Sequence, residues 1–443
     1  MVARTSLSGF PEWLPEGRIV ENAILDHLRR TFELHGFASL ETRAVETLDE
    51  LQRKGETSKE VYVLSRLQDL KEERASKKER PLGLHFDLTV PFARFVIENA
   101  GALAFPFRRY QIQKVWRGER PQDGRFREFT QADIDVVGDG SLAFHHEVEL
   151  PLVMVEALSG LPIPPVTVLV NNRKVVQGFC EGIGISAVDE ALRAIDKLDK
   201  IGAAGVLAEM LENGISQAQG EKLLELAAIR VSTNVTEAVQ ALGVENDLLA
   251  TGLAELEALL EAASKRAPGK VVADLKIARG LDYYTGSVYE TVLEGHEDLG
   301  SICSGGRYDS LATNGKRTYP GVGLSIGVSR LVSRILGQEL ITASRAVPSC
   351  VLVAVNDEAH RAQADDVAYE LRKRGIATEV SPSSAKFGKQ IKYADRRGIP
   401  FVWFTDEDGA HTVKDIRSGE QVAADPQVWM PAETDLQPQL LVK

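Results

Sequence analysis

The chain has 443 residues, of which 44% are hydrophobic and 26% are charged, and its formal net charge is −12. This balance is typical of globular domains and excludes a fibrous or disordered protein, and the length predicts about two to three domains. The negative total argues against a protein that coats nucleic acid indiscriminately, because non-specific affinity comes from neutralising phosphates.

The N-terminal residues predict a helix and then a strand. Apolar residues recur at four-residue spacing from Val20 to Phe32, and Gly36 stands where a helix C-terminal cap belongs. We therefore expect a helix from Pro15 to Gly36. The run GLHFDLTVPFARFV, residues 83–96, is strand-like.

The middle of the chain predicts a long antiparallel hairpin and then a helical insert. Two alternating runs, YQIQKVW at 110–116 and FTQADIDVVG at 129–138, flank a polar loop. From 171 to 265 the text becomes rich in Ala, Leu and Glu at helical spacing. Strand-like and glycine-rich text then returns in residues 270–294, 304–311 and 319–336.

The C-terminal residues predict a separate α/β domain behind a polar linker. GQELITASRAVPS, residues 337–349, has the composition of a linker. After it, strand and helix patterns alternate over residues 351–355, 357–374, 375–380, 381–397 and 399–404. This alternation is typical of a small sheet flanked by helices. The fold class is therefore α/β (α+β).

Cysteine spacing and hydropathy bear on location. The cysteines Cys180, Cys303 and Cys350 lie far apart, without a CxxC pair or a His cluster at metal spacing. We expect neither a disulfide framework nor a zinc site, which fits a reducing cytoplasm. There is no run of about 18 uncharged apolar residues and no basic start followed by an apolar run, so we expect no membrane span and no secretory signal.

Arginines stand within strand-like and glycine-rich text, where a guanidinium must be paired or must face a ligand. Its planar fork suits phosphate and carboxylate groups, and nearby glycines would let the backbone approach a ligand. A polyphosphate site is one interpretation. The arginines are Arg117, Arg125, Arg279, Arg307 and Arg330, and the glycines are Gly305, Gly306, Gly321, Gly323 and Gly327.

Polar groups also alternate along one predicted strand. Gln131, Asp133 and Asp135 would share a face of the sheet, where the core tolerates no unpaired charge. Either this face is exposed to solvent, or it lines a concave site for a cationic or hydrogen-bonding ligand. No P-loop GxxxxGK[ST] is present, and GVGLSIGVSR departs from a dinucleotide-binding fingerprint at Ile326.

Several blocks resemble the histidyl-tRNA synthetase family of class II aminoacyl-tRNA synthetases. RGLDYYTG at 279–286 and GGRYD at 305–309 resemble the two signatures of that family. VWRGERPQDGRFREFTQADIDVVG at 115–138 is similar to class II motif 2, and GVGLSIGVSRL at 321–331 to motif 3. KFGKQIKYADRRGIPFVWF at 386–404 resembles the end of its anticodon-binding domain.

The resemblance implies a domain organisation and a set of partners. A class II catalytic domain with an antiparallel sheet would comprise residues 1–170 and 266–337, interrupted by a helical insertion domain at 171–265. A linker at 338–347 would lead to an anticodon-binding domain at 348–443 with a small mixed sheet. The implied substrates are ATP with Mg²⁺, L-histidine and tRNA(His), and the implied assembly is a homodimer.

The resemblance also implies roles for single residues. Arg279 would bridge the substrate carboxylate and the α-phosphate, and Arg117 would bind the α-phosphate; these two are the catalytic candidates. The implied ATP-binding residues are Arg117, Glu119, Arg125, Phe129 and Arg330. The implied histidine-binding residues are Asp87, Thr89, Gln131, Asp135, Tyr283 and Tyr284. Gly305 and Gly306 are signature glycines, and Arg120 and Gln122 are candidates for contacting the tRNA acceptor stem.

The chain departs from the family pattern at a few positions. Arg43 stands where motif 1 has a proline, Ser329 replaces an acidic residue before the motif 3 arginine, and Asp87 lies in FDLT instead of PEGT. Other proteins with this fold stay as alternatives: a regulatory subunit of ATP phosphoribosyltransferase, or a prolyl, threonyl or glycyl synthetase. The paralogue typically lacks the anticodon domain and the catalytic arginine, and the other synthetases lack RGLDYYTG with GGRYD.

Overall fold

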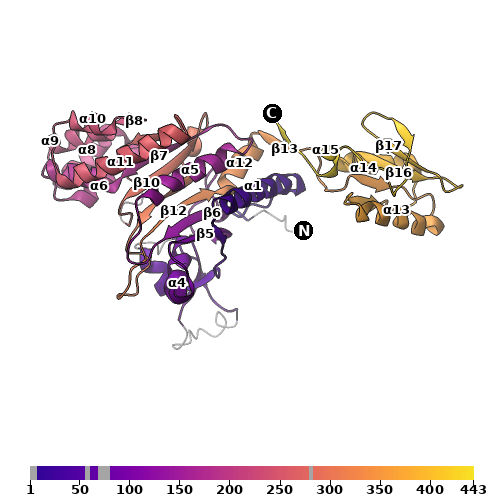
Figure 1. The fold of residues 1–443 in the computed structure, drawn as a ribbon, viewed down its shortest axis with the longest axis horizontal. Helices are drawn as coiled ribbons and strands as arrows, with labels where there is room; N and C mark the ends of the chain where they lie inside the picture. Colours follow the sequence, from indigo (N-terminus) through magenta and orange to yellow (C-terminus); the bar gives the residue numbers. More distant parts are fainter. Residues whose placement is uncertain (1–6, 55–59, 68–79, 279–282) are drawn as a thin grey trace. The chain divides into compact units, whose positions relative to one another are not determined.

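The computed structural model describes residues 7–54, 60–67, 80–278 and 283–443. Its internal contacts divide the chain into two compact units, one of residues 1–11 and 25–334 and one of residues 12–24 and 335–443 (Figure 1). Among the described helices, none is long and apolar enough to cross a membrane.

The first helix is confirmed. Helix α1 spans Pro15–Leu34, and Gly36 follows it with φ of +75°, the left-handed conformation that favours glycine at a helix end. The apolar stripe that predicted it is buried from Val20 to Phe32.

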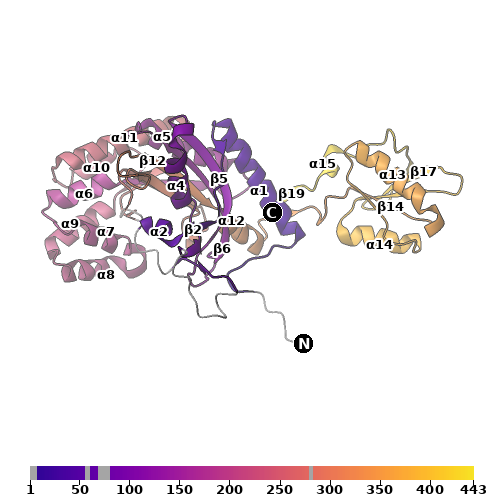
Figure 2. The same cartoon turned by 90° about the horizontal axis from the view of Figure 1, so that it is seen from below.

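A large mixed sheet forms the centre of the first unit, and its middle is antiparallel (Figures 1 and 2). The predicted hairpin is confirmed, because the strands of 107–116 and 128–137 pair antiparallel throughout. Within this sheet, only two pairs of described strands are parallel: β1 (Ala38–Ser39) with β5 (Phe107–Trp116), and β7 (Val166–Asn172) with β9 (Val271–Asp274). The strands in spatial order are β1 (Ala38–Ser39), β5 (Phe107–Trp116), β6 (Glu128–Val137), β12 (Gly321–Gly327), β11 (Cys303–Tyr308), β10 (Ser287–Leu293), β7 (Val166–Asn172), β9 (Val271–Asp274) and β8 (Arg230–Val231).

The prediction of one strand over 83–96 is wrong. A short strand, β4 (Leu82–Leu84), pairs with β2 (Val45–Thr47) and β3 (Val63–Leu64), and helix α4 (Thr89–Asn99) follows it. Asp87 accepts a hydrogen bond from the Val90 amide and so satisfies a free donor at the start of α4. Pro91 lies in the first turn, where no backbone donor is needed.

Helices cover the sheet and fill the insert. Helix α5 (His145–Ser159) packs against β7 and β12, and α12 (Val328–Gly337) follows β12 directly. The predicted helical insert is confirmed in its secondary structure, and Figure 1 shows its helices gathered beyond β7. These helices are α6 (Arg173–Gly182), α7 (Val188–Ile195), α8 (Leu198–Glu212), α9 (Gln217–Ala227), α10 (Val235–Gln240) and α11 (Asp247–Arg266).

The second unit contains a five-stranded mixed sheet in the order β15-β14-β16-β17-β18. Strand β14 is parallel to both neighbours, as the βαβ pattern predicted, and the last pairs are antiparallel. Its strands are β14 (Val351–Val353), β15 (Thr378–Val380), β16 (Phe401–Thr405), β17 (His411–Asp415) and β18 (Gln421–Ala423), and its helices are α13 (Arg361–Lys373), α14 (Phe387–Arg397) and α15 (Glu433–Leu436).

The polar stretch at 337–349 is more ordered than a linker. Strand β13 (Ile341–Ala343) pairs antiparallel with the C-terminal strand β19 (Leu440–Val442). Ile341 is fully buried, and the buried guanidinium of Arg345 donates hydrogen bonds to the carbonyl oxygens of Val347 and Asp435. Composition suggested a linker because pairing with a distant strand leaves no local pattern.

Candidate active site

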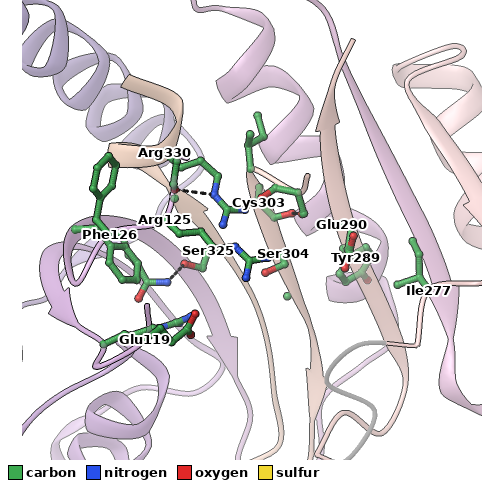
Figure 3. Close-up of a pocket in the computed structure, with 18 of the residues that line it drawn as sticks. Glu119, Arg125, Phe126, Ile277, Tyr289, Glu290, Cys303, Ser304, Ser325 and Arg330 are labelled. Carbon is green, nitrogen blue, oxygen red and sulfur yellow. Dashed lines mark hydrogen bonds between the residues drawn. The ribbon is translucent and has the colours of Figure 1, made fainter. Parts of the chain in front are cut away.

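A cavity of about 370 Å³ lies over the central strands of the large sheet (Figure 3). Strands β6, β10, β11 and β12, the loop between β5 and β6, and the start of α12 contribute its walls. It is lined by Arg117, Glu119, Gly124, Arg125, Phe126, Phe129, Gln131, Ile277, Tyr283, Tyr284, Tyr289, Glu290, Ser301, Ile302, Cys303, Ser304, Gly305, Ser325, Gly327 and Arg330. The predicted ATP-binding residues therefore all line one cavity.

Backbone carbonyl groups orient two of the arginines. Arg117, just after β5, donates from Nε to the Phe86 carbonyl at 3.0 Å, and its guanidinium lies 5.2 Å from the Phe129 ring centroid. Arg330, in the first turn of α12, donates to the carbonyl oxygens of Gly124 at 3.1 Å and Ser301 at 2.6 Å. These carbonyl contacts orient both guanidiniums at the cavity, and the planar fork of a guanidinium suits phosphate.

The loop that carries Arg125 is tied to the rest of the site. Gln122 and Arg125 exchange backbone hydrogen bonds across a tight turn, and both side chains are exposed, as is that of Arg120. Ser329, which departs from the family pattern, accepts a hydrogen bond from the Thr130 amide at 2.9 Å. A short hydroxyl at this position therefore fastens α12 to β6.

A second, much smaller pocket of about 20 Å³ shares four lining residues with the large cavity: Tyr284, Ser304, Gly305 and Ser325. Thr89, Asp133 and Asp135 also line it, together with Tyr308, Gly323 and Leu324. Gly323 is required here, because a Cβ at that position would lie 2.0 Å from Oδ1 of Asp135.

Buried ionic and polar contacts position Asp135. The fully buried Arg109 of β5 contacts Oδ2 of Asp135 at 2.7 Å, and the Tyr308 hydroxyl donates to Oδ1 at 2.8 Å. The Asp135 carboxylate is thus paired, as a charge in a core must be. Sequence reasoning missed both partners, because the register that brings them to Asp135 depends on non-local pairing.

Of the other predicted histidine-binding residues, Thr89, Gln131, Tyr283 and Tyr284 line one or both pockets, and Asp87 lines neither. Thr89 is the first residue of α4, and Asp87, two residues before it, accepts the Val90 amide. Gln131 donates from Nε2 to the hydroxyl of Ser325 at 2.9 Å. The rings of Tyr283 and Tyr284 are in contact, with centroids 4.1 Å apart and planes tilted by 40°. Burial raises the pKa of Tyr283, which therefore stays a neutral phenol.

Part of the first signature cannot be placed. Arg279 lies outside the described residues, and so do residues 280–282. Within the strand-like text of residues 270–294, the described residues form β9 and β10.

Arg307 is paired within the protein, which resolves the choice between pairing and ligand binding. It donates to Glu147 at 2.7 Å and to Asp309 at 3.0 Å. Glu147 of α5, which sequence reasoning missed, also accepts from the Ser287 amide at 3.0 Å. Asp309 accepts from the Thr285 hydroxyl at 2.5 Å. The GGRYD signature therefore anchors the residues that directly follow Tyr283 and Tyr284.

Other lining residues carried no signal in the sequence. Tyr289, Glu290 and Cys303 come from β10 and β11, and they meet the motif 2 loop only through the sheet order. Burial raises the pKa of the Cys303 thiol to about 12, so it is protonated at neutral pH and unsuited to nucleophilic attack. Among the described residues, no group of three His, Cys, Asp or Glu side chains could bind a metal ion.

Comparisons with known proteins match the chain over nearly its whole length. The family model of histidyl-tRNA synthetase matches residues 9–331, and that of an anticodon binding domain matches residues 349–427. A histidine–tRNA ligase of Micrococcus luteus is 60% identical over 453 aligned residues, which cover 99% of each chain. One of Cutibacterium acnes is 57% identical and covers 98% of this chain and 97% of the relative.

A solved structure has the same fold over nearly the whole chain. The histidyl-tRNA synthetase from Nostoc sp. PCC 7120 superposes with a TM-score of 0.84 at 36% identity, covering 96% of this chain and 97% of that one. The anticodon-domain match at 349–427 separates this chain from regulatory paralogues that lack such a domain. The chain belongs to the histidyl-tRNA synthetase family.

Proposed function

We propose that the chain is a histidine–tRNA ligase. It activates L-histidine with ATP to give histidyl-adenylate and pyrophosphate, and then transfers the histidyl group to the 3′ end of tRNA(His). The observation that carries this proposal is the junction of two pockets: an arginine-lined cavity of about 370 Å³ shares a wall with a small pocket lined by buried carboxylates. The large cavity suits a polyphosphate, and the small pocket suits a small cation.

ATP occupies the large cavity in this proposal. Arg117 binds the α-phosphate, Arg125 and Arg330 bind the outer phosphates, Glu119 accepts from the adenine amino group, and Phe129 stacks on the base. Activation is attack by the histidine carboxylate on the α-phosphorus, with pyrophosphate as leaving group, and it needs no protein nucleophile. Catalysis then rests on alignment and on neutralising charge at the pentavalent phosphorus.

In this proposal histidine binds where the two pockets meet, against the wall that they share. Asp87, Thr89 and Gln131 are assigned to its α-amino group, and Asp135 and Tyr284 to its imidazole, beside Tyr283. Partners for both ring nitrogens would be left unpaired by an isostere without those nitrogens, a rejection that can reach about 10⁴-fold. Arg279 is assigned to the substrate carboxylate and the α-phosphate.

Magnesium is expected to enter with ATP, since polyphosphates bind it through their own oxygens plus one or two protein carboxylates. Glu290 on β10 is a carboxylate that lines the cavity, and it fits that role. When bound, the ion supplies positive charge to the outer phosphates, and Arg125 and Arg330 share that task.

The remaining assignments concern tRNA, assembly and location. We assign residues 1–170 and 266–337 to catalysis, 171–265 to the insertion, 338–347 to the linker and 348–443 to anticodon binding. Arg120 and Gln122, exposed on the motif 2 loop, are assigned to the acceptor stem. A homodimer in the reducing cytoplasm is expected, and the described cysteines are buried free thiols.

The first experiment is ATP–pyrophosphate exchange with each of the twenty amino acids. We expect exchange with histidine alone, and a loss of about 10³-fold in Arg279→Ala, because one removed group that stabilises transition-state charge costs on this order. A folded chain that binds ATP but supports no exchange would point instead to a regulatory paralogue.

Two measurements test the partners. Affinity for tRNA(His) should fall as salt rises, since each phosphate contact releases counterions, and a flat dependence would contradict a tRNA interface of this kind. Light scattering should give the mass of a dimer, and a monomer would overturn that expectation.

A further inference from the structure

Asp133, on β6 between Gln131 and Asp135, has no role in the assignments above. Its side chain is buried, with 3% of the residue exposed, and it lines the small pocket with Thr89 and Tyr284. Oδ1 of this carboxylate has no hydrogen-bond partner among the described residues. An unsatisfied buried carboxylate oxygen is costly and requires a reason.

The neighbouring carboxylates already have partners. Asp135 is bound by Arg109 at 2.7 Å and by the Tyr308 hydroxyl. Asp87 accepts the Val90 amide at 3.0 Å and so serves α4. Within the described part of the chain, Asp133 makes no ion pair that matches these. Among the described residues none satisfies this oxygen, which leaves it open to a donor from a bound ligand.

The size of the pocket narrows the choice of group. A volume of about 20 Å³ admits one water-sized group, for which about 10–15 Å³ is enough. An alkylammonium head is of that size, is cationic, and donates three hydrogen bonds. Gly323 keeps the space open, because any Cβ there would collide with the Asp135 carboxylate.

We propose that the Asp133 carboxylate is the principal counter-ion of the substrate's α-ammonium group. This inference rests on the proposed function, since it assigns a partner to one end of the amino acid. Asp87, Thr89 and Gln131 then orient the ammonium, while Asp133 supplies the charge that selects it.

The titration of Asp133 supports this role. Burial raises the pKa of Asp133 to about 7, opposed by the charge of Arg109 on β5 and the hydroxyl of Ser325 on β12. The other titratable groups that face it are Asp135 on β6, Asp87 before α4 and Cys303 on β11. Without substrate the carboxyl is thus partly protonated near neutral pH, and an incoming ammonium must displace that proton.

The test compares two ligands that differ only in the amine. Histidinol carries the ammonium, and 3-(imidazol-4-yl)propan-1-ol lacks it. Calorimetric titration is done on the full chain, Asp133→Asn and Asp274→Asn. Asp274 is a matched control: it is buried on β9, its pKa is also raised by burial, and it has no place in the proposed site.

We expect Asp133→Asn to lose roughly 10- to 100-fold in histidinol affinity, since a hydrogen bond to a charged group contributes on this order. Affinity for the amine-free alcohol should stay within about twofold, and Asp274→Asn should match the unmutated chain. Unchanged histidinol affinity in Asp133→Asn would overturn the inference. So would equal losses for the two ligands, which would mark Asp133 as merely structural.

A measurement without any variant gives a second test. For the unmutated chain, the ratio of histidinol to alcohol affinity should fall as pH drops below about 7, towards tenfold per pH unit, because the imidazole is common to both ligands. A constant ratio from pH 5.5 to 8 would contradict the inference. If the unmutated chain binds neither ligand and supports no histidine exchange, the proposed function itself fails, which is a distinguishable result.

Discussion

The two pockets of the site treat charge in opposite ways. In the large cavity, Arg117 and Arg330 donate to backbone carbonyl oxygens of Phe86, Gly124 and Ser301. In the small pocket, Asp135 is matched by a buried guanidinium at 2.7 Å, whereas Asp133 keeps an oxygen without a partner among the described residues. One wall presents guanidiniums held by backbone carbonyl groups, and the other presents buried carboxylates.

This difference fits the ligand that we propose for each pocket. A polyphosphate is large and flexible and stays partly in solvent, so arginines fixed by carbonyl groups can meet it without reorganisation. An α-ammonium is small and must be told apart from a neutral group, so a desolvated carboxylate gives the greater discrimination. The three predictions that follow test whether the two pockets differ in this way, the first two by kinetics and the last by folding stability.

The largest effect is expected where an arginine is already fixed. Arg117→Ala should lower kcat/KM for ATP in pyrophosphate exchange by about 10² to 10³, as loss of a preorganised donor to the transition state does. Arg125→Ala should lower the same kcat/KM by only about tenfold. The Arg125 side chain is exposed on its loop, and it must be ordered when ATP binds, which reduces its contribution.

Equal losses of kcat/KM in Arg117→Ala and Arg125→Ala would contradict the idea that an arginine held in place before ATP binds contributes more. Histidinol binding measured without ATP provides the control for independence of the pockets. The affinity for histidinol should change less than about threefold in Arg117→Ala. A larger change would show that the contact of Arg117 with the Phe86 carbonyl also supports the structure of the histidine pocket.

A smaller effect, on the KM for histidine, is expected from a substitution of the signature glycine beneath Tyr284. A Cβ at Gly306 would lie 2.7 Å from the Ser287 carbonyl and 2.8 Å from Cδ1 of Tyr284. Gly306→Ala should therefore displace that ring and raise the KM for histidine about tenfold, with the KM for ATP within twofold. Gly337→Ala, at the end of α12 with open space around it, is the matched control and should leave both constants unchanged.

Much of the site could be predicted because its residues lie in contiguous blocks. The hairpin of β5 and β6 follows from alternation within a single stretch, and it places Arg117, Phe129 and Gln131 on one side. The resemblance to a known family then supplied roles that no spacing could supply. These roles for single residues stay predictions until the variants are measured.

The parts that sequence reasoning missed depend on distant segments. Arg109 meets Asp135 across the β5–β6 register, and Glu147 reaches Arg307 and Ser287 from helix α5. Residues 83–96 were predicted as a strand because their apolar run is too short to separate helix from strand by period. The cap by Asp87 decides for a helix, and its target amide lies only three residues ahead.

The sign of a change in folding stability distinguishes a functional carboxylate from a structural one. The pKa of Asp133 is raised to about 7 in the folded chain, so the stability that its protonated form contributes is complete below pH 4. That contribution is lost as pH rises to about 7. Asp133→Asn should therefore be more stable than the unmutated apo chain at pH 8, on the order of 2 kcal/mol, with the gap closing towards pH 4.

Urea denaturation at pH 5 and pH 8 measures that gap. Asp274→Asn should move in the same direction, since burial also raises the pKa of Asp274, but it should keep its histidinol affinity. A variant that gains stability and loses ligand identifies a charge kept in the fold at a cost because substrate requires it. If Asp133→Asn were less stable than the unmutated chain at pH 8, the carboxylate would be a structural partner. The proposed contrast between the two pockets would then not hold for the small pocket.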